Sequence, residues 1–207
     1  LTGQAPARIG LTTHLPGRFF PKDGRPQPAE LVPRLKGEHV TIAERMKEAG
    51  YASAFLGKWH VAPSSGKGGK VDDAVSPRGQ GFDLNVGGTS YGGPPSFFSP
   101  YRNAELEDGP KGEYLPDRLV DETINFIDTS KGKPWMAHLW FYTVHWPMQA
   151  PESLLRKYAN RTGPGLNDTR YGAMIEAMDL AIGRLLSALE KRNLDKDTLV
   201  IFTSDNG

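Results

Sequence analysis

The segment PWMAHLWFYTVH, residues 134–145, constrains the fold more than any other part of the chain, because it is apolar over nearly its whole length. An apolar run without alternation is typical of a strand that is buried on both faces of a sheet. The segment PDRLVDETINFIDT precedes it and spaces Leu119, Ile124 and Ile127 close to a helical period. A helix that leads into a fully buried strand predicts an α/β layer.

The same alternation recurs along the chain. TIAERMKEAG predicts a short helix, because Thr41 and Glu44 stand in the relation of a capping box and Gly50 supplies a stop. YASAFLGKWH follows at strand length, and the residues 169–193 form the longest helical pattern. TLVIFT, residues 198–203, reads as a last buried strand. We therefore predict a mostly parallel sheet sandwiched by helices, with ligands beyond the carboxyl ends of the strands.

Composition excludes several classes of partner. The formal net charge is +1, and the 25 basic and 24 acidic side chains are mixed, so we expect no nucleic-acid partner. No apolar run approaches the roughly 20 residues that a bilayer-spanning helix needs, so we expect no membrane span. The absence of cysteine excludes disulfides, zinc-thiolate sites and a cysteine nucleophile within these residues.

Residues 76–112 are rich in glycine, proline and aromatic side chains and show no period. A connection of this length predicts a functional or partly mobile loop region. The aromatic side chains in it offer two interpretations, a sugar-binding platform or packing into the core, and packing is the favoured one. These side chains are Tyr91, Phe97, Phe98 and Tyr101.

Polar side chains follow the first predicted strand, in the sequence GKWH. If the backbone is still extended there, the period of two places Lys58 and His60 on one side and Trp59 on the other. An ammonium group offsets negative charge, and an imidazole transfers protons near neutral pH, so the pair suits an anionic substrate. The alternative is a solvated lysine and a surface histidine at a strand end.

Two further strand ends carry polar groups. His145 ends the most apolar strand, where Trp146-Pro147 forces an extended or turning exit, whereas His138 inside that strand is expected to be structural. Asp205 and Asn206 follow the last strand and offer the hard oxygen ligands that suit Ca²⁺ or Mg²⁺. Calcium needs about six to eight oxygens, so these two would need further ligands. The alternative for Asp-Asn-Gly is a hairpin turn.

The order of these motifs resembles the catalytic domain of the type I sulfatases, which has the alkaline-phosphatase-like fold. The matching features are GYASAFLGKWH, an apolar strand ending in His-x-Pro, a long helix and the terminal TLVIFTSDNG. LTGQAPARIG at the start resembles the segment that follows the sulfatase nucleophile motif. The resemblance extends over essentially the whole chain.

The resemblance implies a sulfuric ester hydrolase that acts on aryl or carbohydrate sulfates. In that family a hydrated formylglycine attacks sulfur while a calcium ion holds the sulfate oxygens. By position, Asp205 and Asn206 match two calcium ligands, and Lys58 matches the lysine that contacts sulfate and the leaving oxygen. His60 matches the histidine that helps eliminate sulfate, and His145 matches the sulfate-binding histidine that is a candidate acid for the leaving group.

The resemblance also carries expectations about the ends of the chain. Residues 1–207 are expected to be part of a sulfatase catalytic domain that lacks the nucleophile region and the C-terminal subdomain. This polypeptide alone is then expected to be inactive, and the formylglycine and remaining calcium ligands are expected outside it. The full-length protein is expected to need a formylglycine-generating enzyme and to be secreted, periplasmic or lysosomal.

Two other functions stay open at this point. A phosphatase or phosphonate hydrolase of the same superfamily would also use a metal and a Lys/His pair on a tetrahedral anion. A non-catalytic carbohydrate-binding pseudoenzyme would use the aromatic side chains of the glycine-rich region instead.

Overall fold

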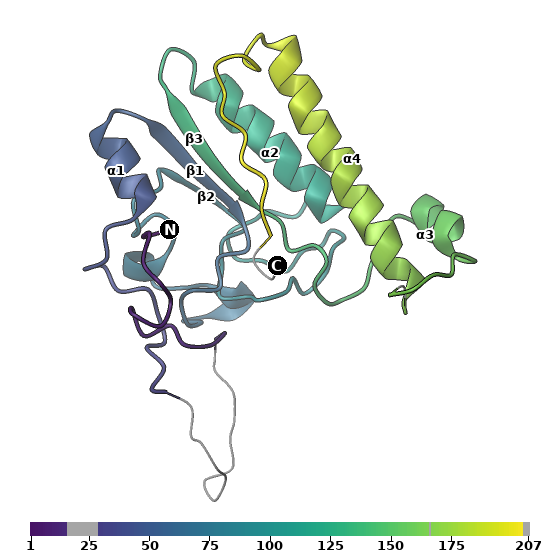
Figure 1. Ribbon diagram of the computed structural model, residues 1–207, viewed down its shortest axis with the longest axis horizontal. Helices are drawn as coiled ribbons and strands as arrows, with labels where there is room; N and C mark the ends of the chain where they lie inside the picture. The colour runs from purple at the N-terminus through teal and green to yellow at the C-terminus, as the bar shows by residue number, and fades with distance from the viewer. Residues whose placement is uncertain (16–28, 166, 205–207) are drawn as a thin grey trace, which may run out of the picture.

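The structure is a computed structural model that describes residues 1–15, 29–165 and 167–204 of the chain. Among the described residues the sheet has three strands in the order β2–β1–β3, and both strand pairs are parallel. The strands are β1 (Ala52–Gly57), β2 (Leu84–Val86) and β3 (Trp135–Trp140) (Figure 1). In register, Ala54 of β1 lies opposite Leu84 on one side and Ala137 on the other. The predicted parallel sheet is confirmed.

Helices cover both faces of this sheet. The α-helices are α1 (Ile42–Glu48), α2 (Leu115–Thr129), α3 (Glu152–Tyr158) and α4 (Thr169–Lys191), and two 3₁₀ turns are η1 (Lys67–Gly69) and η2 (Asp73–Val75). Side chains of β1 alternate between the faces. Phe55 packs in a cluster with Ala43 of α1, whereas Leu56 packs in the cluster that contains Leu119 of α2. Figure 1 shows α4 lying alongside α2, on the side away from α1.

Local sequence explains how α1 begins. The Thr41 hydroxyl accepts a hydrogen bond from the Glu44 amide at 3.2 Å, and the Glu44 carboxylate accepts one from the Thr41 amide at 2.7 Å. The predicted capping box is therefore confirmed. The buried residue of this helix is Ala43, while Ile42 is exposed.

The glycine-rich region, residues 76–112, is more ordered than the sequence predicts. It contains β2, and Phe97 and Tyr101 are fully buried in the main core. The Tyr101 hydroxyl donates to the Glu113 carboxylate at 2.8 Å, which fixes the loop to the start of α2. These aromatic side chains pack into the core, as the favoured interpretation expected, and this removes two members of the possible sugar platform.

Residues 198–203 correct a prediction. The expected buried strand TLVIFT is not paired in the structure, and its apolar side chains are exposed, with Leu199 at 84% and Ile201 at 78%. A strand is buried only where a neighbour pairs with its backbone and a layer covers its faces. In the described part of the chain, residues 198–203 pair with none of the three strands of the sheet.

Candidate active site

Glycine at position 57 lets β1 end against β3. The φ angle of Gly57 is 104°, in the region that favours glycine, and a Cβ at this position would overlap the Trp140 carbonyl oxygen. The amide of Lys58 then donates to the same carbonyl at 2.8 Å. The end of β1 is thus fixed to the end of β3. The chain leaves the sheet after Gly57 and continues with Lys58, Trp59 and His60.

The extended backbone assumed for GKWH does not continue through it, although the burial of its residues alternates. Trp59 is 2% exposed, and its indole nitrogen donates to the Val75 carbonyl at 2.9 Å. Lys58 and His60 are half-buried. The strand has ended at Gly57 and His60 has a φ of 51°, so a continuing strand does not explain this alternation, and the indole is held by its hydrogen bond to Val75.

His60 is held by its backbone and by its ring. Its φ is 51°, an uncommon value for a residue other than glycine, and its amide donates to the Thr89 carbonyl at 3.1 Å. Its Nε2 lies 2.8 Å from the Leu15 carbonyl oxygen. Because a carbonyl can only accept, Nε2 carries the proton, and Nδ1 of the neutral ring carries the lone pair.

Burial and neighbouring positive groups lower the pKa of His60. Burial is the largest cause, and repulsion from Lys58, His14 and His145 acts in the same direction, while the hydrogen bond to Leu15 opposes them. The His60 ring is therefore neutral near pH 7, although the side chains near it are basic. A neutral imidazole beside an ammonium group can take up a proton while an anion is held nearby.

His145 reaches the same area by a different route. The predicted strand that should end at His145 stops at Trp140, because the chain turns at Tyr142, whose carbonyl accepts from the His145 amide at 2.9 Å. His145 is exposed, and its Nδ1 donates to the Trp146 carbonyl at 3.2 Å. The expected location at a strand end was wrong, although the residue still lies beyond the carboxyl end of β3.

One loop contacts both imidazoles. Gly92 and Gly93 are adjacent; a Cβ at Gly92 would lie 2.5 Å from Cε1 of His60, and one at Gly93 would overlap Nδ1 of His145. The structure therefore brings Lys58, His60 and His145 into one neighbourhood.

The other predicted site residues are placed differently. Asp205 and Asn206 lie outside the described residues. Across residues 1–15, 29–165 and 167–204, no three His, Asp or Glu side chains gather as a metal site would require. His138 lies within β3, and its Nδ1 is buried without a hydrogen-bond partner in the described part of the chain. Burial lowers the pKa of His138 to about 4. It behaves as the structural residue that its position in the strand predicted.

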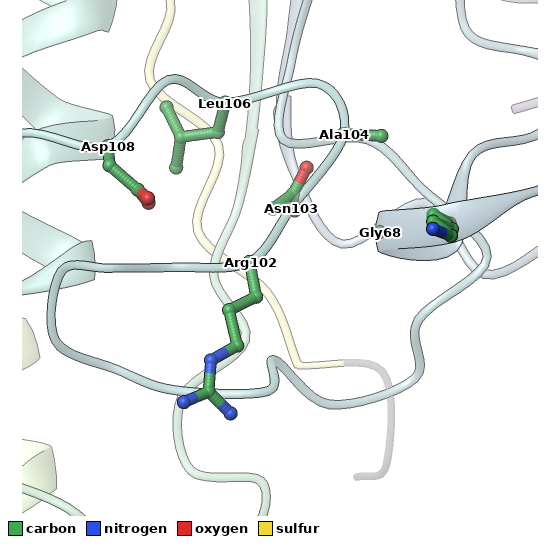
Figure 2. Close-up of a pocket in the computed structure, with 7 residues that line it drawn as sticks. Gly68, Arg102, Asn103, Ala104, Leu106 and Asp108 are labelled. Carbon is green, nitrogen blue, oxygen red and sulfur yellow. The ribbon is translucent and has the colours of Figure 1, made fainter.

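A separate shallow hollow of about 340 Å³ lies near the glycine-rich region (Figure 2). Figure 2 shows the Arg102 side chain extending away from Gly68 and Ala104. The lining residues are Lys67, Gly68, Arg102, Asn103, Ala104, Leu106 and Asp108. None of the three strand-end side chains lines this hollow, so it is distinct from the candidate active site.

Sequence reasoning missed four residues of this neighbourhood. His14 helps to lower the pKa of His60, Leu15 fixes the tautomer of the His60 ring, and Gly92 and Gly93 leave room for the two rings. The Gly-Gly pair was visible in the sequence, but no local pattern connects it to histidines that lie far away along the chain.

Comparison with solved structures defines the fold class. A crystal structure of Ps i-CgsB in complex with k-i-k-neocarrahexaose matches 93% of this chain and 43% of its own, with a TM-score of 0.66 and 24% identity. A structure from work on the metabolism of glycosaminoglycans by Bacteroides thetaiotaomicron matches 96% of this chain and 46% of its own, with a TM-score of 0.67 and 20% identity. The fold is the alkaline-phosphatase-like α/β fold of sulfatases.

Sequence comparison identifies the family. The Sulfatase family model matches residues 1–207, so the chain belongs to the sulfatase family. It is 30% identical over 230 residues to the uncharacterized sulfatase YdeN of Escherichia coli (strain K12), and 28% identical over 232 residues to N-acetylgalactosamine-6-sulfatase of Canis lupus familiaris. All of this chain is covered in both cases, but it spans only 37% and 39% of the two relatives. The predicted family and fold are confirmed.

Proposed function

We propose that the protein that contains this chain hydrolyses sulfate esters, with Lys58, His60 and His145 in its active site. The observation that carries the proposal is the convergence of these three side chains beyond the ends of β1 and β3. Lys58 and His145 both lower the pKa of His60, and both imidazoles pack against the same glycine pair. Membership of the sulfatase family supports the reaction class.

Each side chain has a role that its environment suits. Lys58 offsets the negative charge of the sulfate and of the leaving oxygen. His60 is neutral near pH 7, so it can accept a proton when sulfate is eliminated. His145 is exposed beyond β3, so it can reach the ester oxygen and donate a proton to the leaving group.

We propose calcium as the metal and formylglycine as the nucleophile, with Asp205 and Asn206 as two of the metal ligands. Carboxylate and amide oxygens suit a hard cation, whereas the described part of the site contributes basic side chains. A bound calcium ion would supply Lewis-acid stabilisation of the charge on the sulfate oxygens. A formylglycine-generating enzyme is the partner that this proposal requires.

The proposed substrate is a sulfated glycan or a smaller sulfate ester. Structurally similar proteins include one in complex with k-i-k-neocarrahexaose and one in complex with D-glucosamine-2-N,6-O-disulfate. Within the described residues no helix is long and apolar enough to cross a membrane. The proposed location, secreted, periplasmic or lysosomal, follows from the family alone.

Sulfate release from a panel of sulfated sugars and an aryl sulfate by the full-length protein tests the function. The variant Lys58→Ala should lower kcat/KM by about 100-fold, since it removes a charge that stabilises the transition state. It should also move the acidic limb of the pH profile to higher pH, because the pKa of His60 rises when the ammonium is removed.

The control is Lys70→Ala, at an exposed lysine that follows η1. Mass spectrometry of the same preparation should detect formylglycine. Faster turnover of phosphate esters than of sulfate esters would favour the phosphatase alternative. An unmodified precursor residue and no turnover of any ester would favour the pseudoenzyme.

We further propose that residues 1–207 are part of a catalytic domain and are inactive when separated from the rest of it. The chain spans less than two fifths of the two relatives, and the apolar side chains of residues 198–203 are exposed. Clear turnover of a sulfate ester by the purified 207-residue chain would refute this proposal.

A further inference from the structure

The segment GGTSYGG, residues 87–93, is here named the glycine loop, and it is attached to the ends of both β1 and β3. The Gly87 carbonyl accepts from the Tyr142 hydroxyl at 3.0 Å, beyond the end of β3. The Thr89 carbonyl accepts from the His60 amide at 3.1 Å, beyond the end of β1. The loop is therefore fixed by hydrogen bonds before its last two residues reach the imidazoles.

Histidine rings occupy the space that a side chain would need at Gly92 and Gly93, the last two positions of the glycine loop. A Cβ at Gly92 would lie 2.5 Å from Cε1 of His60, 2.9 Å from its Nδ1 and 3.0 Å from its Nε2. A Cβ at Gly93 would overlap Nδ1 of His145 and lie 2.5 Å from the Trp146 carbonyl oxygen. Each distance is shorter than atoms in contact allow, so any side chain at these positions displaces the neighbouring ring.

Backbone conformation does not explain why these residues are glycine. Gly87 has a φ of 78°, a value that favours glycine, but neither Gly92 nor Gly93 is among the glycines with positive φ. The φ angle therefore gives no reason for glycine at Gly92 or Gly93. What glycine supplies at these two positions is room for the rings.

We propose that Gly92 and Gly93 are positioning residues that together set the separation of His60 and His145. The two residues are adjacent in one anchored loop, yet each limits a ring that follows a different strand. The catalytic meaning of this inference rests on the proposed function, whereas the geometric part does not.

The two glycines differ in what must move when they are replaced. At Gly92 all three close atoms belong to the His60 ring, which can rotate away but then loses its hydrogen bond to Leu15. At Gly93 a backbone carbonyl is also in the way, so the chain around His145 must shift with the ring. A displaced His60 ring is less buried, so its pKa should rise towards the ordinary value.

The test compares Gly92→Ala and Gly93→Ala in the full-length protein with Gly37→Ala. Gly37 has no positive φ, and a Cβ there would meet no atom within 4 Å. We expect the NMR signals of the histidine Cε1–H groups to respond selectively. Gly92→Ala should shift the signal and raise the pKa of His60, Gly93→Ala should shift the signal of His145, and Gly37→Ala should change neither. In the active enzyme, kcat/KM should fall by about 10- to 100-fold for the first two variants only.

A double-mutant cycle keeps the test valid if Gly92→Ala lowers stability. The destabilisation caused by Gly92→Ala should largely disappear in a His60→Ala background, since the ring that the new methyl group meets is gone. An equal loss in both backgrounds would overturn the proposal, as would histidine signals that match those of Gly37→Ala. A wild-type protein without sulfatase activity would overturn the proposed function instead, while the NMR measurement and the cycle would still decide the role of the glycines.

Discussion

The segments that follow β1 and β3 each place a histidine in the same part of the molecule. Different contacts fix the two histidines. Beyond β1, Trp59 is buried and hydrogen-bonded, and the half-buried His60 is bonded through both its amide and its ring. Beyond β3, the chain turns at Tyr142, and the ring of the exposed His145 donates to the carbonyl of the next residue.

The comparison shows that the residues after a strand have well-defined positions where buried or hydrogen-bonded side chains anchor them. A buried indole two residues beyond Gly57 leaves the backbone little freedom, so the positions of Lys58 and His60 follow from β1. Beyond β3, Tyr142 is also buried and donates to Gly87, but His145 lies three residues further on, and its exposed ring is limited by Gly93 of the glycine loop. Substitutions in the segment after β1 should therefore lower stability as well as activity, whereas substitutions in the segment after β3 should mainly lower activity.

Replacing Gly57 should disrupt the segment that follows β1 and have the largest effect on the free energy of unfolding. Gly57→Ala places a methyl group on the Trp140 carbonyl at a φ of 104°, and should lower the free energy of unfolding by about 3–5 kcal/mol. Chemical denaturation of Gly57→Ala and of the wild type measures this loss of stability. The matched control is Gly183→Ala, in an open position of α4, which should be neutral or slightly stabilising. Equal stability of the two variants would show that the close approach of β1 and β3 is not as described.

Trp59, which follows β1, should contribute more to stability than Trp146, which follows β3. Trp59→Phe removes the hydrogen bond to Val75 and part of a fully buried ring, so it should destabilise the protein by about 2 kcal/mol. Trp146→Phe changes a ring that is 64% exposed and should cost less than about 0.5 kcal/mol. Thermal melting of both variants measures the difference, and a larger loss for Trp146→Phe would reverse the comparison.

His138, inside β3, should make the stability of the protein depend on pH. The pKa of His138 is about 4 in the folded protein and about 6.5 when unfolded, so the unfolded state binds more protons between these values. Stability should fall by about 1–2 kcal/mol as the pH drops from 6.5 to 4, after allowance for partial exposure of the ring. His138→Phe should remove that component, as seen by denaturation at several pH values. An unchanged pH dependence would contradict the buried, unpaired state of the ring.

The two site histidines should have small and unequal effects on stability. His60→Ala leaves the Leu15 carbonyl without its donor and should cost about 1 kcal/mol. His145→Ala should cost less than about 0.5 kcal/mol, because the ring is exposed. Melting temperatures of the two variants check this order, and equal losses would mean that both exits are anchored alike.

Local patterns in the sequence predicted the parts of the fold that local contacts determine. The capping box predicted the start of α1, helical spacing predicted α2 and α4, and the apolar runs predicted two parallel strands. The alternation of Trp59 with Lys58 and His60 was predicted from an extended backbone, which the structure does not have at His60. The short helix α3 was missed, because it directly follows Pro151 in a segment that reads as a loop.

Long-range contacts determine the rest, and a single sequence does not contain them. Residues 198–203 have the composition of a buried strand, but burial depends on a neighbouring strand that pairs with them. The packing of Gly93 on His145 joins two segments that are distant along the chain. For the same reason the positions of Lys58 and His60 could be predicted, whereas the turn that carries His145 could not.

The rate of sulfate release by the full-length protein, measured for the wild type, His60→Ala and His145→Ala, tests the central claim most directly. We predict that each substitution lowers kcat/KM for a sulfated sugar by at least about 100-fold, and that His145→Ala does so with an unchanged melting temperature. Activity within about threefold of the wild type for both variants would contradict the assignment of the two strand-end histidines to a sulfatase active site.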